Sequence, residues 1–594
     1  MTAPPPLLIQ GGRVLDGAAV PHPADPRAGG LLADVLVEDG RVAAIAPTIA
    51  PPPGARVLDA GGCWVTPGFV DLHTHYDAEI ELAPALGESV RHGVTTIALG
   101  SCGLSMAVGR PVDLADMFCR VEGIPRETVL PLLEEIVDWH DPAGYLDHLA
   151  GLPLGPNVAC LLGHSTIRAH VLGIDRSLDP ATRLTASEAA QMDALVERAL
   201  DAGYLGLSIN TLPWDKMDGD AHRSKPTPSV HATWGEYRRL MRVLRRRDRV
   251  LQAVPNLATK LNVLLFLASA VAIGRPRLRT TLLALMDAKA DRVAPRLAAW
   301  GARFVNAVLG GDLRFQALPC PFDLWTDGLE VPVLEEIGAG TAALHVRDPA
   351  ERAALLRDPA FRARFRRDWG AWLTGRAFHR DLDDTEILAC PDPSVVGRSF
   401  AQVAAARGQD PIDCFLDLQA DHGDALRWYT VVANDRPAVL EWILTRPDIL
   451  VGFSDAGAHL RNMAYYNFGL RLLYRVREAE RAGRPFLSVG QAVHRLTGEI
   501  GDWLGIDAGH LAVGRRADVV VVDPAGLTEQ VERATEAPVP GFDRLQRVVR
   551  RNDDAVRAVV IGGRLAWHQA AFSEDFGSAG GYGRVLRAGG AGSA

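Results

Sequence analysis

The stretch GFVDLHTHYDAEI, residues 68–80, decides how the rest of the chain is interpreted. It begins as an apolar run typical of a buried β-strand, and this run leads into His73 and His75, one residue apart. Side chains two positions apart in a strand lie on the same face, so both imidazoles would point to one place. The pair predicts a site for one divalent metal ion, although two histidines on one strand face also occur without such a role.

Apolar runs of similar length recur along the chain and are separated by amphipathic helical patterns. Together with the first run they number eight, the others being VTTIALGSCG, NVACLLGH, YLGLSIN, RVLQAV, RTTLLALMD, RFVNAVLG (303–310) and ILVGFSD. Sequences typical of capping boxes, Thr185 to Glu188 and Thr233 to Glu236, open two of the helices. Eight strands that alternate with helices predict an α/β fold, a closed (β/α)8 TIM-like barrel with its site at the C-terminal ends of the strands.

The two ends of the chain differ from this middle part. Short β-rich segments fill residues 1–66, where Asp39-Gly40 is typical of a tight hairpin turn, and strand patterns return over residues 507–575. The opening segment has too few strands to form a stable sheet alone. We therefore expect both ends to build one small β-sandwich domain beside a barrel of residues 67–506.

Three further segments depart from the barrel pattern. Residues from about 311 to 440 do not fit one strand-helix unit and predict an inserted helical subdomain or lid. Residues 576–594 are rich in glycine and alanine and indicate a loose tail. The longest apolar run, LNVLLFLASAVAIG at 261–274, is shorter than the roughly 20 residues that cross a bilayer. We expect this run to form a buried core helix.

The composition is that of a soluble globular protein, with 48% hydrophobic and 23% charged residues in a chain of 594. A net charge of -9 gives no overall attraction to nucleic acid or to an anionic membrane, so neither is expected as a partner. The N-terminus MTAPPPLLIQGG lacks the features of a secretory signal, and the seven cysteines are scattered without paired spacing. These features predict a cytoplasmic protein and leave homo-oligomer formation open.

Motifs along nearly the whole chain resemble those of the amidohydrolase superfamily. VTPGFVDLHTHYD is preceded by GRVAAIAP and followed far downstream by LAVGRRADVVVVDP. Within the superfamily, HTHYD, the cysteine of VTTIALGSCGLS, GHSTIR and the late GFSDAGAHL resemble the D-aminoacylase branch, the N-acyl-D-amino-acid deacylases. The resemblance implies a (β/α)8 barrel with an appended β-sandwich, a zinc ion at its mouth, and hydrolysis of the amide of an N-acyl-D-amino acid or similar small N-acyl compound.

The resemblance also implies roles for individual residues. His73 and His75 match the metal ligands of the first strand, Cys102 matches a zinc-binding cysteine of the second, and Asp455 matches the aspartate of the eighth. Zinc would activate water and polarise the carbonyl, while Asp455 would act as general base and then as general acid. From the residues alone, Cys102 is also typical of a small buried side chain and Asp455 of a turn or helix cap.

Other ligands that are common in the superfamily are missing. The fourth, fifth and sixth runs carry Asn210, Gln252 and Asp287 where a carboxylated lysine or histidines would be expected. One zinc ion per chain, held by the four matched residues or some of them, is the simplest interpretation, and Asp287 is either a further ligand or a helix cap. Two alternatives stay open: a cyclic amide hydrolase of the hydantoinase kind, and a metal-free barrel that acts as a binding or scaffold protein.

Basic residues near the predicted mouth are candidates for substrate binding. Arg223 and Lys225 lie in the loop DGDAHRSKPTP after the fourth strand, on the side where active-site loops emerge. Their charges suit the carboxylate of an N-acyl amino acid, although basic residues in such loops are as often only solvated. His459, four residues after Asp455, is expected to contact substrate or orient a ligand, and His164 to be structural.

Overall fold

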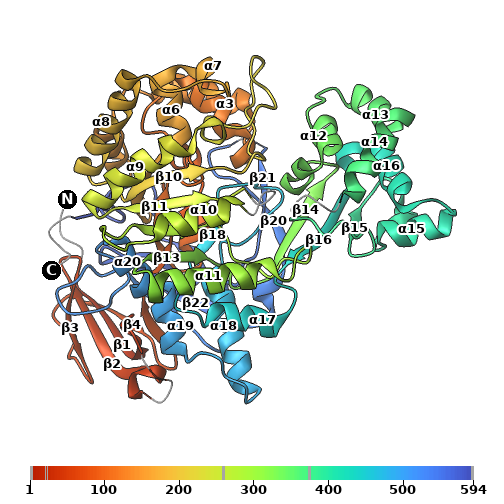
Figure 1. Cartoon of the computed structure of the whole chain (residues 1–594). Coiled ribbons are helices and arrows are strands. Elements are labelled where there is room, and N and C mark those ends of the chain that lie inside the picture. Colours follow the sequence, from red (N-terminus) through yellow and green to blue (C-terminus); the bar gives the residue numbers. More distant parts are fainter. Residues whose placement is uncertain are drawn as a thin grey trace.

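A closed barrel of parallel strands forms the centre of the computed structural model (Figure 1). The structure describes residues 5–20, 22, 25–256, 261–371, 376–542 and 544–589. The barrel strands in chain order are β6 (Phe69–Asp71) with β7 (His73–Thr74), β8 (Val94–Leu99), β9 (Asn157–Gly163), β10 (Gly206–Asn210), β11 (Val250–Val254), β12 (Arg279–Leu282), β13 (Asp312–Gln316), and β17 (Ile449–Leu450) with β18 (Phe453–Ala456). Neighbours pair in this order, and β18 pairs with β7 to close the barrel, so the predicted fold class is confirmed.

Helices surround the barrel. The predicted capping box at the start of α8 (Ala186–Ala202) is complete. At α9 (Trp234–Arg247), Thr233 accepts the N–H of Glu236, but the carboxylate of Glu236 contacts His164 instead of returning to the cap. The other helices around the barrel are α1 (Glu79–Leu82), α2 (Gly87–Val90), α3 (Pro111–Glu122), α4 (Arg126–Ile136), α5 (Pro142–Gly151), α6 (His164–Leu172), α7 (Ile174–Ser177), α10 (Leu261–Ala270), α11 (Ala294–Val308), α17 (Pro437–Leu444), α18 (Phe468–Arg481), α19 (Val489–Leu496) and α20 (Gly498–Leu504). Within the described residues, none of the helices has the length and apolarity needed to cross a membrane.

The seventh strand lies later in the chain than the sequence indicates. Most of residues 303–310 belongs to α11, and β13 begins only after Gly310 and Gly311. Apolar residues occur on more than one side of α11. The run therefore lacks the three-to-four-residue spacing of a helix with one apolar side and resembles a buried strand. The correction places Gln316, at the end of β13, at the mouth of the barrel.

Between β13 and β17 the chain forms an inserted subdomain, on the right in Figure 1. It runs from β14 (Phe322–Asp327) to β16 (Arg427–Ala433), which is shorter than the predicted 311–440. The insertion contains helices, as predicted, but also an antiparallel sheet of β14, β16 and β15 (Glu386–Ala389). Its helices are α12 (Gly338–Leu344), α13 (Pro349–Arg357), α14 (Pro359–Gly370), α15 (Phe400–Arg407) and α16 (Pro411–His422).

Strands from both ends of the chain share a second sheet, in the order β24-β23-β22-β19-β5-β1-β2-β3 with β4 paired to β1. The two ends meet where β5 (Trp64–Pro67) pairs antiparallel with β19 (Val519–Val522). Val65 and Val521 belong to one buried apolar cluster of this sheet. The remaining strands are β1 (Leu7–Val14), β2 (Leu31–Glu38), β3 (Arg41–Ala46), β4 (Arg56–Asp59), β22 (Val556–Ile561), β23 (Arg564–His568) and β24 (Ala571–Phe572), while β20 (Thr535–Pro538) and β21 (Gln546–Val549) form a separate hairpin.

Residues 576–589 do not form the loose tail that the composition of residues 576–594 predicts, and the last five residues of that range lie outside the described part. Val158 of β9 donates its N–H to the carbonyl of Arg584, and Leu586 donates its N–H to the carbonyl of Val158. The side chains of Leu586 and Ala588 are buried against the start of the barrel strands. Backbone pairing and two apolar side chains therefore fix a segment that glycine content alone marks as mobile.

Candidate metal centre and adjoining cavity

His73 and His75, at the end of the first barrel strand, meet Cys102 from the loop after β8. One ligand atom of each lies within 4.8 Å of those of the other two, and all three side chains are buried. Sγ of Cys102 is 3.3 Å from Nε2 of His73. No other group of three histidine, cysteine or acidic side chains in the described part of the chain meets in this way. The predicted ligands of the first and second strands are thus brought together.

Asp455 approaches the same cluster from β18. Its Oδ1 lies 3.5 Å from Nε2 of His73 and 3.4 Å from Nε2 of His75. The backbone φ angles of Asp455 and Cys102 are 57° and 53°, in the left-handed region that such residues rarely adopt. Backbone strain at two of the four predicted ligands is typical of a functional site, where the surrounding fold holds an otherwise unfavourable geometry.

Burial sets the protonation state of the two imidazoles. It lowers the pKa of His73 to about 3 and that of His75 well below its usual value, so both are neutral at pH 7. Nδ1 of His73 lies 2.8 Å from Oε1 of Gln316, a geometry that fits an N–H donated to the amide oxygen. Nε2 then directs its lone pair toward Cys102 and Asp455, as in histidines that bind metals.

The cluster gathers electron-pair donors that face one another. Burial, together with the charges of Asp215 and Asp455, raises the pKa of the Cys102 thiol well above its usual value. A divalent cation would reverse this effect by stabilising the thiolate and accepting the lone pairs that face one another. Two imidazoles, a thiol and a carboxylate form a donor set that fits a zinc ion.

Two glutamines from other strands contact the metal cluster. Gln252 of β11 accepts the N–H of Cys102 at 3.2 Å through Oε1, and its Nε2 lies 3.2 Å from Nδ1 of His73. Gln316 of β13 makes the shorter contact with the same nitrogen of His73. Gln252 thus lies on the fifth strand, where the resemblance suggests a further metal ligand, while Gln316 lies on the seventh, and both amides orient the ligands instead.

Two other residues weighed from the sequence have structural contacts. Asp287 is buried and ion-paired with Arg436, so it does not join the metal cluster. His164 is buried between Oε1 of Glu236 and Oγ of Ser229, each 3.1 Å from one of its ring nitrogens. The expectation that His164 is structural is confirmed.

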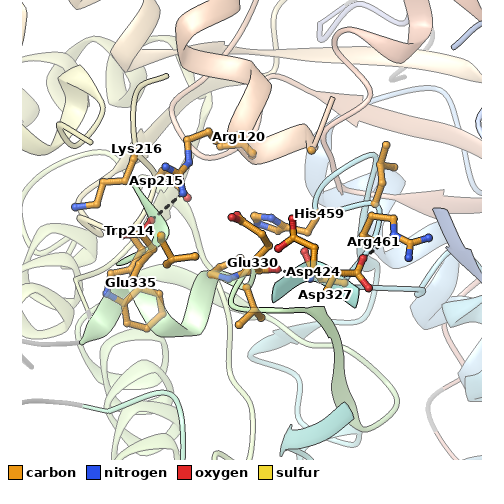
Figure 2. Close-up of a pocket in the computed structure, with 17 residues that line it drawn as sticks. Arg120, Trp214, Asp215, Lys216, Asp327, Glu330, Glu335, Asp424, His459 and Arg461 are labelled. Carbon is orange, nitrogen blue, oxygen red and sulfur yellow. Dashed lines mark hydrogen bonds and ion pairs between the residues drawn. The ribbon is translucent and has the colours of Figure 1, made fainter. Parts of the chain in front are cut away.

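A cavity of about 470 Å³ adjoins the cluster (Figure 2). His459 and Asp215 are both in its wall. Asp215, together with the larger effect of burial, raises the pKa of Asp455 to about 7. His459 likewise contributes to the lowered pKa of His75, behind burial and His73. Because His459 lies only four residues after Asp455, and Asp215 and His459 both act electrostatically on the cluster, the cavity lies close to the metal-binding residues.

Three cations line this cavity, and two of them are already paired. Arg120 lies 3.0 Å from Glu335, and Arg461 lies 2.9 Å from Asp327, on opposite sides of the cavity in Figure 2. The ammonium of Lys216 makes no hydrogen bond or ion pair with any residue that the structure describes, and burial lowers its pKa. Lys216 is therefore the cation in this wall that is available to an anionic ligand.

The basic residues predicted to bind substrate lie outside this cavity. Arg223 pairs with Asp218 and lines a neighbouring cavity of about 590 Å³, while Lys225 is exposed beside His222. Lys216 belongs to the same loop after the fourth strand, so the sequence indicated the correct loop but not the residue. His459, by contrast, does line the cavity, where it was expected to contact substrate.

Comparisons with known proteins agree with this geometry. No family model matches the chain. An uncharacterized protein of Mycobacterium tuberculosis is 48% identical over 558 residues, which cover 93% of this chain and 91% of that protein. N-acyl-D-aspartate deacylase and D-aminoacylase of Alcaligenes xylosoxydans xylosoxydans are 33% and 34% identical, each over 34% of this chain and over 36% and 37% of their own lengths.

The fold also matches solved structures. The crystal structure of N-acyl-D-glutamate deacylase from Bordetella bronchiseptica, complexed with zinc and a phosphonate inhibitor, aligns with a TM-score of 0.63 at 24% identity, covering 98% of this chain and 99% of that one. The chain therefore belongs to one family with the uncharacterized protein of Mycobacterium tuberculosis. About a third of its sequence is similar to the D-aminoacylase and the N-acyl-D-aspartate deacylase, and its fold matches that of the N-acyl-D-glutamate deacylase along almost its whole length.

Proposed function

We propose that the protein is a metal-dependent hydrolase that cleaves the amide of an N-acyl-D-amino acid or a similar small N-acyl compound. The observation that carries this proposal is the convergence of His73, His75, Cys102 and Asp455 beside a cavity. Similarity to D-aminoacylase and N-acyl-D-amino-acid deacylases supports hydrolysis of a carbon-nitrogen bond. The D configuration is taken only from the activities that the names of the related enzymes state.

The proposed reaction needs a stronger nucleophile than water and a more electrophilic carbonyl than that of a free amide. A zinc ion in the cluster would lower the pKa of a water molecule and polarise the carbonyl. Asp455 takes a proton as water adds to the carbonyl carbon, and returns it to the nitrogen as the C–N bond breaks. Burial raises the pKa of Asp455 to about 7, and a bound cation would lower it again, which leaves the carboxylate ionised and able to accept a proton. The products are a carboxylic acid and an amine.

The cavity offers a place for each part of such a substrate. We assign the substrate carboxylate to Lys216, because this cation has no partner among the described residues and burial strengthens its attraction for an anion. Val331, Pro332 and Leu344 give another part of the wall an apolar surface for the acyl group. His459 lies in the wall beside His75 and is placed to contact the amide.

A hydrolysis panel of N-acyl D- and L-amino acids, run with added zinc and with a chelator, tests this function. We expect turnover of D substrates that the chelator abolishes and zinc restores, with about one equivalent of zinc in the purified protein. Turnover of L substrates alone would contradict the assigned stereochemistry. Turnover of hydantoins alone would indicate a cyclic amide hydrolase, and a protein that stays inert and metal-free after zinc addition would indicate a scaffold.

A further inference from the structure

The longest apolar run of the chain, residues 261–274, predicts a buried helix, but the structure buries only one side of it. Phe266 is fully buried in α10, where its ring contacts α9. By contrast, Leu261 and Leu264 each expose 61% of their surface, and Ile273 exposes 69%. Large apolar side chains at this level of exposure are grouped here on α10 and the turn after it, rather than scattered singly over the surface.

The next helix, α11, presents its large side chains to solvent and its small ones to the barrel. Ala299 and Ala302 are fully buried. On the other side, five apolar residues spaced three or four apart expose between 55% and 66% of their surface. They are Val293, Leu297, Trp300, Phe304 and Val308. A helix that is apolar on both sides is normally covered on both. The apolar face is defined as these five residues together with Leu261, Leu264 and Ile273.

Arginines dominate the exposed charges around the apolar face, and the exposed Asp435 near its start is paired with Arg292. Between residues 261 and 311, every charged side chain classed as exposed is an arginine: Arg275, Arg277, Arg296 and Arg303. Arg275 donates only to backbone carbonyls of α10 and the loop after it, and the other three make no hydrogen bond or ion pair with any described residue. A positive fringe therefore borders this face of a protein whose net charge is -9.

The positive fringe continues onto the neighbouring helix α9. Trp234 of α9 packs on Phe266 of α10 with ring centroids 5.1 Å apart, and Figure 1 shows α9, α10 and α11 following one another across the same side of the barrel. Arg238 and Arg242 of α9 are exposed and lie one helical turn apart. Within the described residues, neither has an acidic partner. Basic side chains thus border the apolar face along α9 as well.

We propose that the apolar face docks the protein onto the surface of an anionic lipid bilayer. Trp300, Phe304 and the aliphatic side chains would enter the headgroup boundary, where amphipathic helices bury their apolar side. The arginines would pair with lipid phosphates, and each basic residue near such a surface adds to binding. The net charge of the whole chain predicts no membrane partner, whereas the local charge of this face is of the opposite sign.

A second copy of the chain fits this face less well than a bilayer. In a two-fold dimer the same patch meets itself, so arginines of both copies would approach one another with no acidic side chain from the face to balance them.

Cosedimentation of the full-length protein with vesicles tests the proposal. Vesicles of phosphatidylcholine mixed with phosphatidylglycerol should bind the protein, with a bound fraction that falls as salt rises, and vesicles of phosphatidylcholine alone should bind much less. The double variant Leu297→Ser, Phe304→Ser should lower the partition coefficient about tenfold or more, because two large apolar side chains are lost from the contact. Arg296→Glu with Arg303→Glu should remove the preference for anionic vesicles.

The matched control is the double variant Leu31→Ser, Leu32→Ser in the terminal sheet, where these leucines are 57% and 66% exposed. It should bind vesicles as the wild type does, and thermal unfolding of all variants should match. The proposal is overturned if the wild-type protein stays in solution with both vesicle types, or if the control loses binding equally. A dimer in light scattering that Leu297→Ser, Phe304→Ser converts to a monomer, without vesicle binding, would make the face an interface between copies instead.

Discussion

The mouth of the barrel has two halves with different chemistry. The first, second and eighth strands lead into the two histidines, the cysteine and the aspartate, which can all bind a metal ion. The fourth, fifth and seventh strands carry Asn210, Gln252 and Gln316, whose amides give and accept hydrogen bonds. The difference indicates a division of labour, in which one half holds a single ion while the other positions ligands and substrate.

Replacement of Asp455 by asparagine should have the largest effect, because it removes the only carboxylate of the ligand half without changing the size of the side chain. Turnover should fall by about 10²- to 10⁴-fold, as expected for loss of a general base and acid. Steady-state kinetics with zinc analysis and thermal unfolding of the same sample would separate chemistry from folding. Undiminished turnover in the variant would show that Asp455 has no part in proton transfer.

Zinc affinity should rise with pH, because only the ligand half contains groups that lose protons. Burial raises the pKa of Cys102 well above its usual value and that of Asp455 to about 7. Zinc must displace these protons, so affinity should increase about tenfold per pH unit for each proton released, with two released below pH 7 and one above it. Competition with a chromophoric chelator between about pH 5.5 and 8.5 measures this slope. A flat profile would remove the thiol and carboxylate from the ligand set.

The variant Gln316→Ala tests whether the amide half supports the ion. Loss of the acceptor for Nδ1 of His73 should weaken zinc binding about 10- to 100-fold, as is usual when the partner of a ligating histidine is removed. Gln316→Glu keeps an acceptor and should retain more affinity. Gln419→Ala, at a buried glutamine of the inserted subdomain, is the control for loss of a buried amide. Equal zinc affinity in wild type and Gln316→Ala would mean that the halves act independently.

The smallest expected effect is that of Lys216→Ala, in the loop after the fourth strand. The Michaelis constant for an N-acyl amino acid should rise about tenfold with little change in kcat, because one charge-assisted contact to the carboxylate is lost. Lys225→Ala, in the same loop but exposed, should leave both constants unchanged. A substrate whose carboxylate is replaced by a neutral amide should bind wild type and Lys216→Ala equally. A fall in kcat alone would argue against the assigned carboxylate contact.

The sequence predicts the ligand half of the mouth because its signals are local. Two histidines on one strand face, and an aspartate directly after an apolar run, have positions that strand geometry fixes. Gln316 was missed because α11 is apolar on both sides, so its last residues resemble a strand and displace the true seventh strand from the count. The seventh strand was misplaced because α11 carries apolar side chains on its outer side as well as on the side that packs on the barrel.

The cavity residues needed the folded chain. Lys216 lies in an irregular loop, where backbone conformation depends on contacts far away in the sequence, such as those that position Arg120 and Glu335 opposite it. No periodic pattern distinguishes it from Lys225. The position of the C-terminal segment also depends on distant contacts, since Leu586 pairs with Val158 of β9, more than 400 residues earlier.

The pairing of β5 with β19 has a consequence for biosynthesis. These strands are separated by about 450 residues, so the ribosome needs roughly 20 to 90 s to supply the partner of an already completed strand. Throughout that interval the emerging polypeptide carries an open sheet edge that can pair with neighbouring nascent chains. We therefore expect yield in a heterologous host to depend on chaperone supply, and a gene shortened to end at codon 506 to give insoluble product.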